Sequence, residues 1–447
     1  MRASAIWLLP LYLAPGLHAQ QPDLERILQR LDQLERENQQ LKQSLDALRK
    51  EVTVLRGATS TDSAQAAQIA AEKAEVLQQR VEEQAQTKVE SGQKLPVTLS
   101  GLAIMNTFFY AGRTGGEDLP MVGRVAPNQR VAGGTFRNSQ IAIGYSGSQT
   151  VLGARAAGRI QFDFFQGTLA NAQNHLARIR TAHVGLDWEQ HSLSFAVDKP
   201  IFSPREPASF SQLGVSAFAN SGNLWLWQPQ VRYEERIAFS EKSGLRARLG
   251  VYQTNDSLTP VPAGTVISRA RPAAQGRFEF FHETASGRRI EIAPGFHRSQ
   301  SLVTGGSVAS SAASIDWLVP LAPRLDWTGF AFTGQNLAGL GVSGLRQGIT
   351  FRQGRPLAVA SKGGWTQTAL QITNRWKFHL LAGMHDDRNA DLAADGIGRN
   401  LTYGGNFHFL LSPNLILSLE ALQIRTDYLR SGLRLVNRYD LAIGYLF

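Results

Sequence analysis

The chain contains no cysteine and little charge, since only 18% of its 447 residues are Asp, Glu, Lys or Arg. The absence of cysteine excludes a disulfide framework and every metal site built on thiolates. Ordinary soluble domains have about 25% charged residues, so this composition is unusual for one. After the first twenty residues no apolar run approaches the roughly 18 residues of a membrane-spanning helix. A helical membrane span is therefore excluded.

Lysine is scarce in the larger part of the chain. Residues 96–447 contain 34 basic residues, of which four are Lys and 30 are Arg, against 23 acidic residues. Residues 20–95 have 11 basic and 13 acidic residues. The formal charge of +10 therefore belongs to the second part of the chain.

The first residues have the pattern of an export signal. Met1 and Arg2 give a short positive start, an apolar stretch follows from Ile6 to Leu13, and Ala19 is a small residue at the expected cleavage position. This pattern predicts a signal peptide over 1–19 and an exported protein.

An uninterrupted heptad pattern follows within 20–57. Its seam residues are spaced alternately by three and four: Leu24, Ile27, Leu31, Leu34, Asn38, Leu41, Leu45, Leu48, Val52 and Leu55. The pattern predicts an α-helical coiled coil with another copy of the chain, in which Asn38 sets the register. The alternative is one amphipathic helix packed on the second part. Leu at d with Asn at a leans towards a dimer, which the attached domain can override. Residues 58–95 are predicted as a weaker helix or linker.

Residues 96–447 consist of segments in which apolar and polar residues alternate, as in β-strands with one apolar face. In the last segment, 434–447, aromatic and aliphatic residues take every second position. The segment 222–239 has the same pattern, with Trp225 and Trp227 on its apolar face. We count sixteen segments; which face is apolar is unclear for those that start at residues 97, 324 and 414.

A soluble β-sandwich is the alternative for these segments, but three features favour a membrane barrel. The segments run to about 10–14 residues, which suits a tilted membrane span. Aromatic residues lie at their apolar ends, and tight turns such as 241–244 alternate with long loops such as 112–135. A sheet in lipid must close because unpaired edge groups are costly there. The sequence therefore predicts an all-β transmembrane barrel of about 16 antiparallel strands over 96–447, with a water-filled lumen rather than a packed core.

Short motifs resemble those of a known family. The last strand, Arg438 to Phe447, ends the chain on Phe and resembles the C-terminal assembly signal of bacterial outer-membrane barrels. Leu99-Ser-Gly-Leu, the stretch 136–145 (Phe-Arg-Asn-Ser-Gln-Ile-Ala-Ile-Gly-Tyr) and Gln-Pro-Gln-Val-Arg-Tyr at 228–233 add to this pattern. With the signal peptide and the coiled coil, the chain resembles the DcaP-like porins, relatives of the phosphate-selective O/P-type porins. The segment 191–203 departs from the Gly-, Gln- and Trp-rich pattern that the resemblance leads us to expect.

The resemblance implies a homotrimer that takes up small anions, with dicarboxylates as a known class. A bacterial outer-membrane location, with the coiled coil in the periplasm, follows from the same features. The expected partners are outer-membrane lipid, small anionic solutes and the barrel-assembly machinery.

Arginines dominate the polar faces of the predicted strands, where they would line the lumen and select anions. The candidates are Arg155, Arg159, Arg178, Arg180, Arg232, Arg236, Arg246, Arg248, Arg277, Arg289 and Arg438. For each, the alternative is a salt bridge in the wall. The pairs 178/180 and 246/248 have no acid between them and are the better ligand candidates. The connection 199–221 either folds inward as a constriction, with Lys199 and Arg205 near the narrowest point, or is an ordinary external loop.

Other functional classes fit the sequence less well. The acidic stretch 386–396 lacks the terminal Glu of a calcium-binding EF-hand loop, and the nine His show no metal spacing, so no metal and no cofactor is predicted. No catalytic set can be identified, and we expect no enzyme. Export and lumen placement explain the basic charge better than nucleic acid does. We therefore predict an outer-membrane porin for small, preferentially anionic solutes such as dicarboxylates or phosphate-like anions. The alternative is a structural envelope protein with a barrel anchor and a periplasmic coiled-coil tether.

Overall fold

The computed structural model describes residues 97–447, with gaps at 115, 117, 120, 128, 167–174, 257–260, 269, 305, 343–344 and 346. The chain divides into two units, Met1–Leu95 and Pro96–Phe447, of which the second is described here. The predicted signal peptide (1–19), the coiled coil with Asn38 (20–57) and the helix or linker (58–95) lie outside the described residues. No helix in the described part has the length and apolarity needed to cross a membrane.

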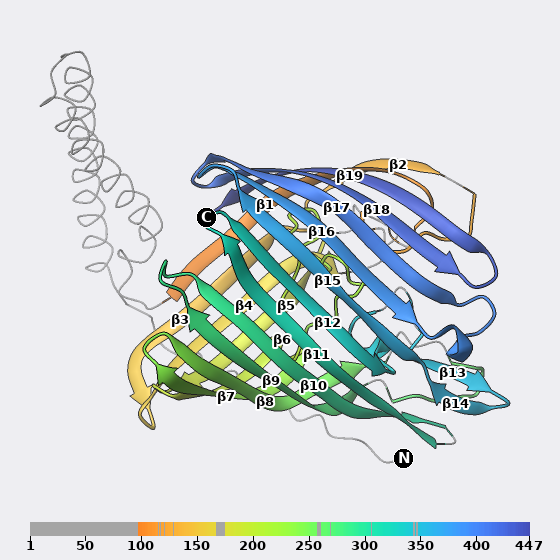
Figure 1. The fold of residues 1–447 in the computed structure, drawn as a ribbon, viewed down its shortest axis with the longest axis horizontal. Helices are drawn as coiled ribbons and strands as arrows, with labels where there is room; N and C mark the ends of the chain where they lie inside the picture. The colour runs from red at the N-terminus through yellow and green to blue at the C-terminus, as the bar shows by residue number, and fades with distance from the viewer. Residues whose placement is uncertain are drawn as a thin grey trace, which may run out of the picture. The chain divides into compact units, whose positions relative to one another are not determined.

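The described residues form a large antiparallel sheet, a separate two-stranded hairpin and two short 3-10 helices (Figure 1). The sheet contains β1 (Val97–Ala111), β2 (Arg130–Thr135), β3 (Gln140–Val151), β4 (Ala154–Gln166), β5 (Leu176–Asp187), β6 (His191–Asp198), β7 (Gln228–Ser240), β8 (Ser243–Asn255), β9 (Ala270–Glu283), β10 (Arg289–Val303), β11 (Gly306–Ala322), β12 (Leu325–Gln335), β15 (Ala360–Gln371), β16 (Trp376–Asp387), β17 (Ile397–Ser412), β18 (Leu415–Tyr428) and β19 (Gly432–Leu446). The hairpin is β13 (Ile349–Arg352) with β14 (Arg355–Ala358), and the 3-10 helices are η1 (Ala338–Leu340) and η2 (Asn389–Asp391).

The sheet closes on itself because β1 pairs with β19, from Leu102↔Leu446 to Ala111↔Asn437. On its other edge β1 pairs with β3 over Val97–Leu102 and with β2 over Asn106–Ala111. Strands β2 and β3 therefore share one position in the ring, and the seventeen strands of the sheet make a barrel of sixteen positions. The predicted closed antiparallel barrel of sixteen strands is confirmed.

Side chains alternate between the two faces of the wall, as the pleat of a β-strand requires. Along β19, Tyr439, Leu441 and Ile443 are exposed on the outward face, whereas Arg438 and Asp440 are buried on the inward face. In β1, β12 and β18 apolar residues lie on both faces. Their inward members include Ile104, Phe108, Phe330, Phe332 and Ile424. That double apolar character explains why the sequence alone leaves the facing of these strands unclear.

The two ends of the barrel differ. At one end, which we call the turn end, tight connections join β7 to β8, β9 to β10 and β17 to β18, and both Val97 and Phe447 lie there. At the opposite, loop end, long connections include 199–227 and 336–359. The predicted alternation of short turns and long loops is confirmed. The hairpin β13–β14 within 336–359 is an element that the alternation did not predict.

The connection 199–227, called the inner segment below, crosses the interior of the barrel. Its hydrogen bonds reach strands on all sides of the ring: Ile201 to Gln275 of β9, Ala208 to Gln367 of β15, Phe210 to Asn106 of β1, Gln212 to Glu420 of β18, Gly214 to Arg178 of β5 and Asn220 to Asn400 of β17. A segment bonded to opposite walls lies inside the ring. The inward alternative for this connection is therefore correct, and the external-loop alternative is wrong.

The interior near the inner segment is packed with apolar side chains. Phe202 and Phe218 of the inner segment form one buried cluster with Phe330 of β12, Trp365 of β15 and Leu340 of η1. A second cluster joins residues of the inner segment to Leu119 and Phe165. The expectation of a lumen without a packed core is therefore wrong for this part of the barrel, because long connections turn inward and bury their own apolar residues.

Residues 222–227 belong to the inner segment rather than to a wall strand. Trp225 and Trp227 are buried in the second cluster, and Trp225 Nε1 donates a hydrogen bond to the carbonyl oxygen of Gly341, 2.8 Å away. The predicted strand 222–239 begins only at Gln228. The placement of both Trp side chains on the outward face is therefore wrong, although Val231 and Tyr233 do point outward.

Gly222 generates a prediction about this packing. Its φ is +96°, and a Cβ added there would lie 2.1 Å from the carbonyl oxygen of Gly364 in β15. Gly153 has a similar φ of +76° but nothing within 4 Å of an added Cβ. Both substitutions to Ala impose left-handed strain of about 1–2 kcal/mol, and Gly222→Ala adds overpacking of about 1–3 kcal/mol. Urea unfolding in detergent should therefore give a lower midpoint for Gly222→Ala than for Gly153→Ala; equal midpoints contradict the close contact.

Candidate functional site: the arginine-lined interior

All eleven predicted arginines lie on the inward face of the wall, from β4 to β10 and on β19. Residues directly opposite each other on neighbouring strands share one face of the wall. The arginines share their face with side chains that contact the inner segment, and this face points inward. In β5 a register shift next to Phe162 keeps both Arg178 and Arg180 inward, where each donates a hydrogen bond to a carbonyl oxygen of the inner segment. The inward face therefore carries arginine on β4, β5, β7 to β10 and β19, whereas β6 has none.

Nine of the eleven form ion pairs with carboxylates. The pairs are Arg178 and Arg180 with Asp163, Arg232 with Asp198, Arg236 and Arg248 with Glu234, Arg246 and Arg277 with Glu279, Arg289 with Glu291, and Arg438 with Asp440. Arg155 and Arg159 are exposed and make no ion pair with any described residue. The wall salt bridge, the alternative weighed for each arginine, is what the structure contains at these nine positions.

The arginines 178/180 and 246/248, which the sequence indicates as the better ligand candidates, form salt bridges with acids on neighbouring strands. The Arg178 guanidinium makes two hydrogen bonds with Asp163, of 2.7 and 3.0 Å, although Asp163 is on β4 and Arg178 on β5. Arg248 likewise pairs with Glu234 of the neighbouring β7. A search for acids within the same strand misses such partners, because the register of adjacent strands decides which side chains meet.

From β7 to β11 the inward charges form one network of alternating sign. Arg277 is its centre: the guanidinium is nearly fully buried and makes two 2.7 Å hydrogen bonds with Asp316 and one of 2.5 Å with Glu279. Arg246 and Arg289 also bond Glu279. Such forked, charge-assisted bonds have both strength and fixed geometry. The network holds the arginines of this wall in defined positions.

The inner segment is fastened to this network by Arg205. Its guanidinium pairs with Asp316 of β11 at 2.5 Å and with Glu291 of β10. Lys199, the other constriction candidate, pairs with Glu206 of the same segment at 3.4 Å and remains about one-fifth exposed. The two constriction candidates therefore differ in their surroundings. Arg205 is bound to the wall, whereas the side chain of Lys199 is partly exposed.

The inner segment also packs against the wall formed by β6–β8. Ile201 lies next to Gly250 of β8, and the Tyr252 hydroxyl donates a hydrogen bond to the carbonyl oxygen of Leu226. Partly exposed charged side chains gather at this wall and at the facing part of the inner segment: Asp198, Lys199, Glu206, Arg232 and Arg248. Asp198 and Glu206 were missed in the sequence, although each directly neighbours a predicted site residue, which is the signal that identifies them.

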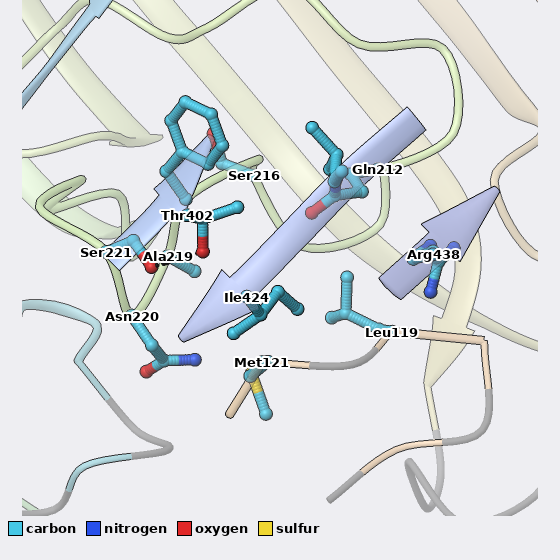
Figure 2. A pocket seen from close by; sticks show the side chains of 12 residues that line it. Leu119, Met121, Gln212, Ser216, Ala219, Asn220, Ser221, Thr402, Ile424 and Arg438 are labelled. Carbon is cyan, nitrogen blue, oxygen red and sulfur yellow. Dashed lines mark hydrogen bonds between the residues drawn. The ribbon is translucent and has the colours of Figure 1, made fainter. Parts of the chain in front are cut away.

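A small cavity lies on the other side of the inner segment. Figure 2 shows it between Ala219, Asn220 and Ser221 of that segment, Leu119 and Met121 of the 112–129 connection, and wall residues that include Arg438. Arg438 is almost fully buried and is held by two 2.6 Å hydrogen bonds to Asp440. The predicted lumen-lining residue Arg438 therefore lines this small cavity.

The acidic stretch 386–396 at the loop end uses its carboxylates internally. Asp391 accepts two hydrogen bonds from Arg388, of 2.8 and 2.6 Å, and these hold the pKa of its carboxyl below the usual value. Asp386 pairs with Lys362, and Asp387 with His385. Among the described residues no group of His, Asp and Glu converges in a way that could hold a metal ion.

The sequence matches no family model and no curated protein. The structure is similar to solved outer-membrane proteins. The outer membrane channel DcaP of Acinetobacter baumannii matches with a TM-score of 0.62 at 15% identity, over 78% of this chain and 97% of that one. The OmpF of Salmonella typhi matches with a TM-score of 0.51 at 10% identity, over 78% and 97%. The predicted resemblance to DcaP is confirmed at the level of the fold.

The anchoring role of Arg205 generates a second prediction. Arg205→Ala leaves Asp316 and Glu291 with one cation fewer, and breaking a buried ion pair costs about 3–5 kcal/mol. Arg155→Ala removes an exposed arginine without an ion pair and should change the free energy of unfolding by less than about 0.5 kcal/mol. Chemical unfolding of both variants in detergent measures this difference. Similar losses in the two variants would contradict the anchor.

Proposed function

We propose that this protein is an outer-membrane porin, in which a partly water-filled channel lets small and preferentially anionic solutes diffuse. The observation that carries the proposal is the division of the barrel wall into two faces. The outward face exposes aromatic and aliphatic residues such as Tyr439 and Leu441, and the inward face bears the eleven predicted arginines as well as Arg271. The similarity to DcaP and OmpF supports the fold on which this function depends.

The proposed orientation follows from the two ends of the barrel. Outer-membrane barrels have short periplasmic turns and longer extracellular loops. The turn end, where Val97 begins and Phe447 ends the described chain, therefore faces the periplasm. The coiled coil predicted for 20–57 precedes this end and belongs in the periplasm as well. Phe447, whose backbone bonds Gly101 across the closing pairing, is the proposed signal for the barrel-assembly machinery.

The proposed solute path passes the partly exposed charged residues Asp198, Lys199, Glu206, Arg232 and Arg248. Its charged residues are mostly paired, so the local field is moderate and an anion is not held too tightly to leave, as conduction requires. Arg155 and Arg159 near the turn end make no ion pair with a described carboxylate, since Asp187, which lies opposite Arg155 in the register of β4 and β5, pairs with Arg236. Arginine at these points suits carboxylate and phosphate groups because it offers paired donors.

Ion selectivity tests the proposal. In planar bilayers with a KCl gradient, the reversal potential should show preference for chloride. The double variant Arg155→Gln/Arg159→Gln should reduce that preference, because two uncompensated lumen charges are lost. Arg324→Gln/Arg375→Gln removes two exposed charges at the same end but outside the lumen and serves as the matched control. Cation preference of the unmodified protein contradicts the anion-selective function.

We also propose a homotrimer, which the DcaP-like resemblance implies and which chemical crosslinking of detergent-extracted protein can count. The heptad pattern of 24–55 is the observation that favours a second function, in which the coiled coil tethers the outer membrane. Deletion of residues 24–86 distinguishes the two. Unchanged solute uptake is expected if the barrel is the functional unit, whereas a loss of envelope integrity with unchanged uptake assigns the tether role to the deleted residues.

A further inference from the structure

A row of buried polar side chains crosses the inward face of the wall from β16 to β19. His379 of β16 lies opposite Asn406 of β17, and Asn406 lies opposite Glu420 of β18. Glu420 in turn lies opposite Asp440 of β19. All four side chains are buried. The charged residues of the proposed solute path include none of these four.

The hydrogen bonds of this row run in one direction and end on the inner segment. Nδ1 of His379 donates to the side-chain oxygen of Asn406, 2.7 Å away, because an amide oxygen can only accept. The Asn406 amide nitrogen donates to the carbonyl oxygen of Ala208 at 2.8 Å and to Glu420 at 3.2 Å. The Gln212 amide donates to the other oxygen of Glu420 at 3.0 Å. A chain that begins at a histidine therefore holds the inner segment to this side of the barrel.

A second histidine, His408 of β17, lies between the row and residues 208–212 of the inner segment, which we call the arm. The ring of Phe210 in the arm packs edge-on against the ring of His408, with 4.6 Å between the ring centres. The rings of His379 and His408 are also 4.6 Å apart. Nε2 of His408 is buried and has no hydrogen-bond partner among the described residues. The two imidazoles are therefore in mutual contact and covered by the arm.

Protonation of both imidazoles places two like charges in contact in a buried site. Lys377 lies opposite His408 in the register and acts electrostatically on both rings, so it adds to the repulsion. Repulsion between charges this close is strong where water is excluded, and a buried charge without a partner is costly. Both imidazoles can become charged only if the rings separate or reach water, and either change requires Phe210 and the arm to move.

The acids of the row do not compensate such charges. Both oxygens of Glu420 already accept hydrogen bonds, one from Asn406 and one from Gln212. Asp440 is held by two 2.6 Å hydrogen bonds from Arg438. Among the described residues, neither imidazole forms an ion pair with a carboxylate. The contact between the two rings is therefore stable only while at least one of them is uncharged.

The arm is fastened on both sides, which limits where it can go. Arg205 fixes the residues before it to the charge network of β10 and β11, and Arg178 and Arg180 fix the residues after it to β5. The other bonds of the arm to the wall, with Asn106 and Gln367, join uncharged groups. An arm that leaves the row while its ends stay in place moves towards the centre of the barrel.

We propose that His379 and His408 form an acid-sensitive latch for the arm. The held conformation requires uncharged imidazoles, whereas the released conformation accepts protons, so acid shifts the population towards release. The released arm narrows the interior and lowers the flow of solute. Only this last effect rests on the proposed channel function, because release of the arm does not depend on solute flow.

A spin label on the arm of the full-length protein tests the latch. The chain has no cysteine of its own, so Ser209→Cys carries a single nitroxide. The label should be immobile at about pH 7 and mobile at about pH 4, the range in which His titrates. The ratio of mobile to immobile label should rise by up to about a hundredfold per pH unit when two histidines take up protons, and by up to about tenfold in His408→Gln, which keeps the His379 bond.

The double variant His379→Gln/His408→Gln should keep the label immobile at about pH 4. His191→Gln/His282→Gln removes two histidines at the turn end and should respond to acid as the unmodified protein does. Retention of the unboiled gel mobility verifies that each variant is folded. A label that stays immobile in the unmodified protein at about pH 4, or that is released equally in the double variant, overturns the latch.

Single-channel conductance of the same proteins, measured in planar bilayers over the same pH range, tests the effect on flow. Conductance should fall as the label becomes mobile in the unmodified protein, and it should not fall in the double variant. Release of the label at constant conductance overturns the narrowing of the interior. Absence of conductance at every pH contradicts the porin function instead, since the label reports movement of the arm without any flow.

Discussion

The closing pairing between β1 and β19 is the constraint on which the rest of the structure depends. Ten residue pairs join these strands, although about 330 residues of chain separate them. Without the pairing, both strands would present free backbone donors and acceptors, each costing several kcal/mol in hydrocarbon. Closure is therefore what permits an apolar outward face, and the enclosed interior is what permits so many charged side chains on the inward face.

The interior of the barrel holds the long inner segment in place. Polar bonds and apolar packing along the segment both contribute. Arg205 joins it to the charge network of β10 and β11, Arg178 and Arg180 donate to its carbonyl groups, and Phe202 and Phe218 pack against β12 and β16. Arg178, Arg180 and Arg205, which the proposed channel places on its inner surface, therefore also hold the inner segment to the wall. Their carboxylate partners offset part of their positive charge.

Properties set within one strand could be predicted from the sequence. The alternation along 434–447 predicted the outward face of β19, and the tight turns at 241–244 and 412–414 predicted where strands end. The inward facing of all eleven arginines follows from the same period of two. The facing of β1, β12 and β18 could not be predicted in this way, because apolar residues lie on both faces of these strands. Connections inside the barrel cover the inward apolar face.

Properties that depend on register or on tertiary contact could not be predicted. Arg178 and Asp163 are fifteen residues apart, and only the alignment of β5 with β4 brings them together. In the sequence, Trp225 continues the alternating pattern of β7. In the structure its indole is buried inside the barrel, where it packs against apolar residues and donates a hydrogen bond to the carbonyl oxygen of Gly341. Asn138, in the connection between β2 and β3, accepts a hydrogen bond from the backbone N–H of Gly214 in the inner segment, 2.7 Å away. No local pattern contains this information.

The central claim is that the outward face of the wall meets lipid, whereas the inward face of β4 meets water. The absence of cysteine makes this directly measurable with single-cysteine variants along β4 in the native membrane. Cysteines at positions 155, 157 and 159 should react with a charged, membrane-impermeant thiol reagent, because these positions face the lumen. Cysteines at positions 156, 158 and 160 should react only with a lipid-soluble reagent. Uniform labelling by the charged reagent, or labelling with the opposite alternation, would contradict the account.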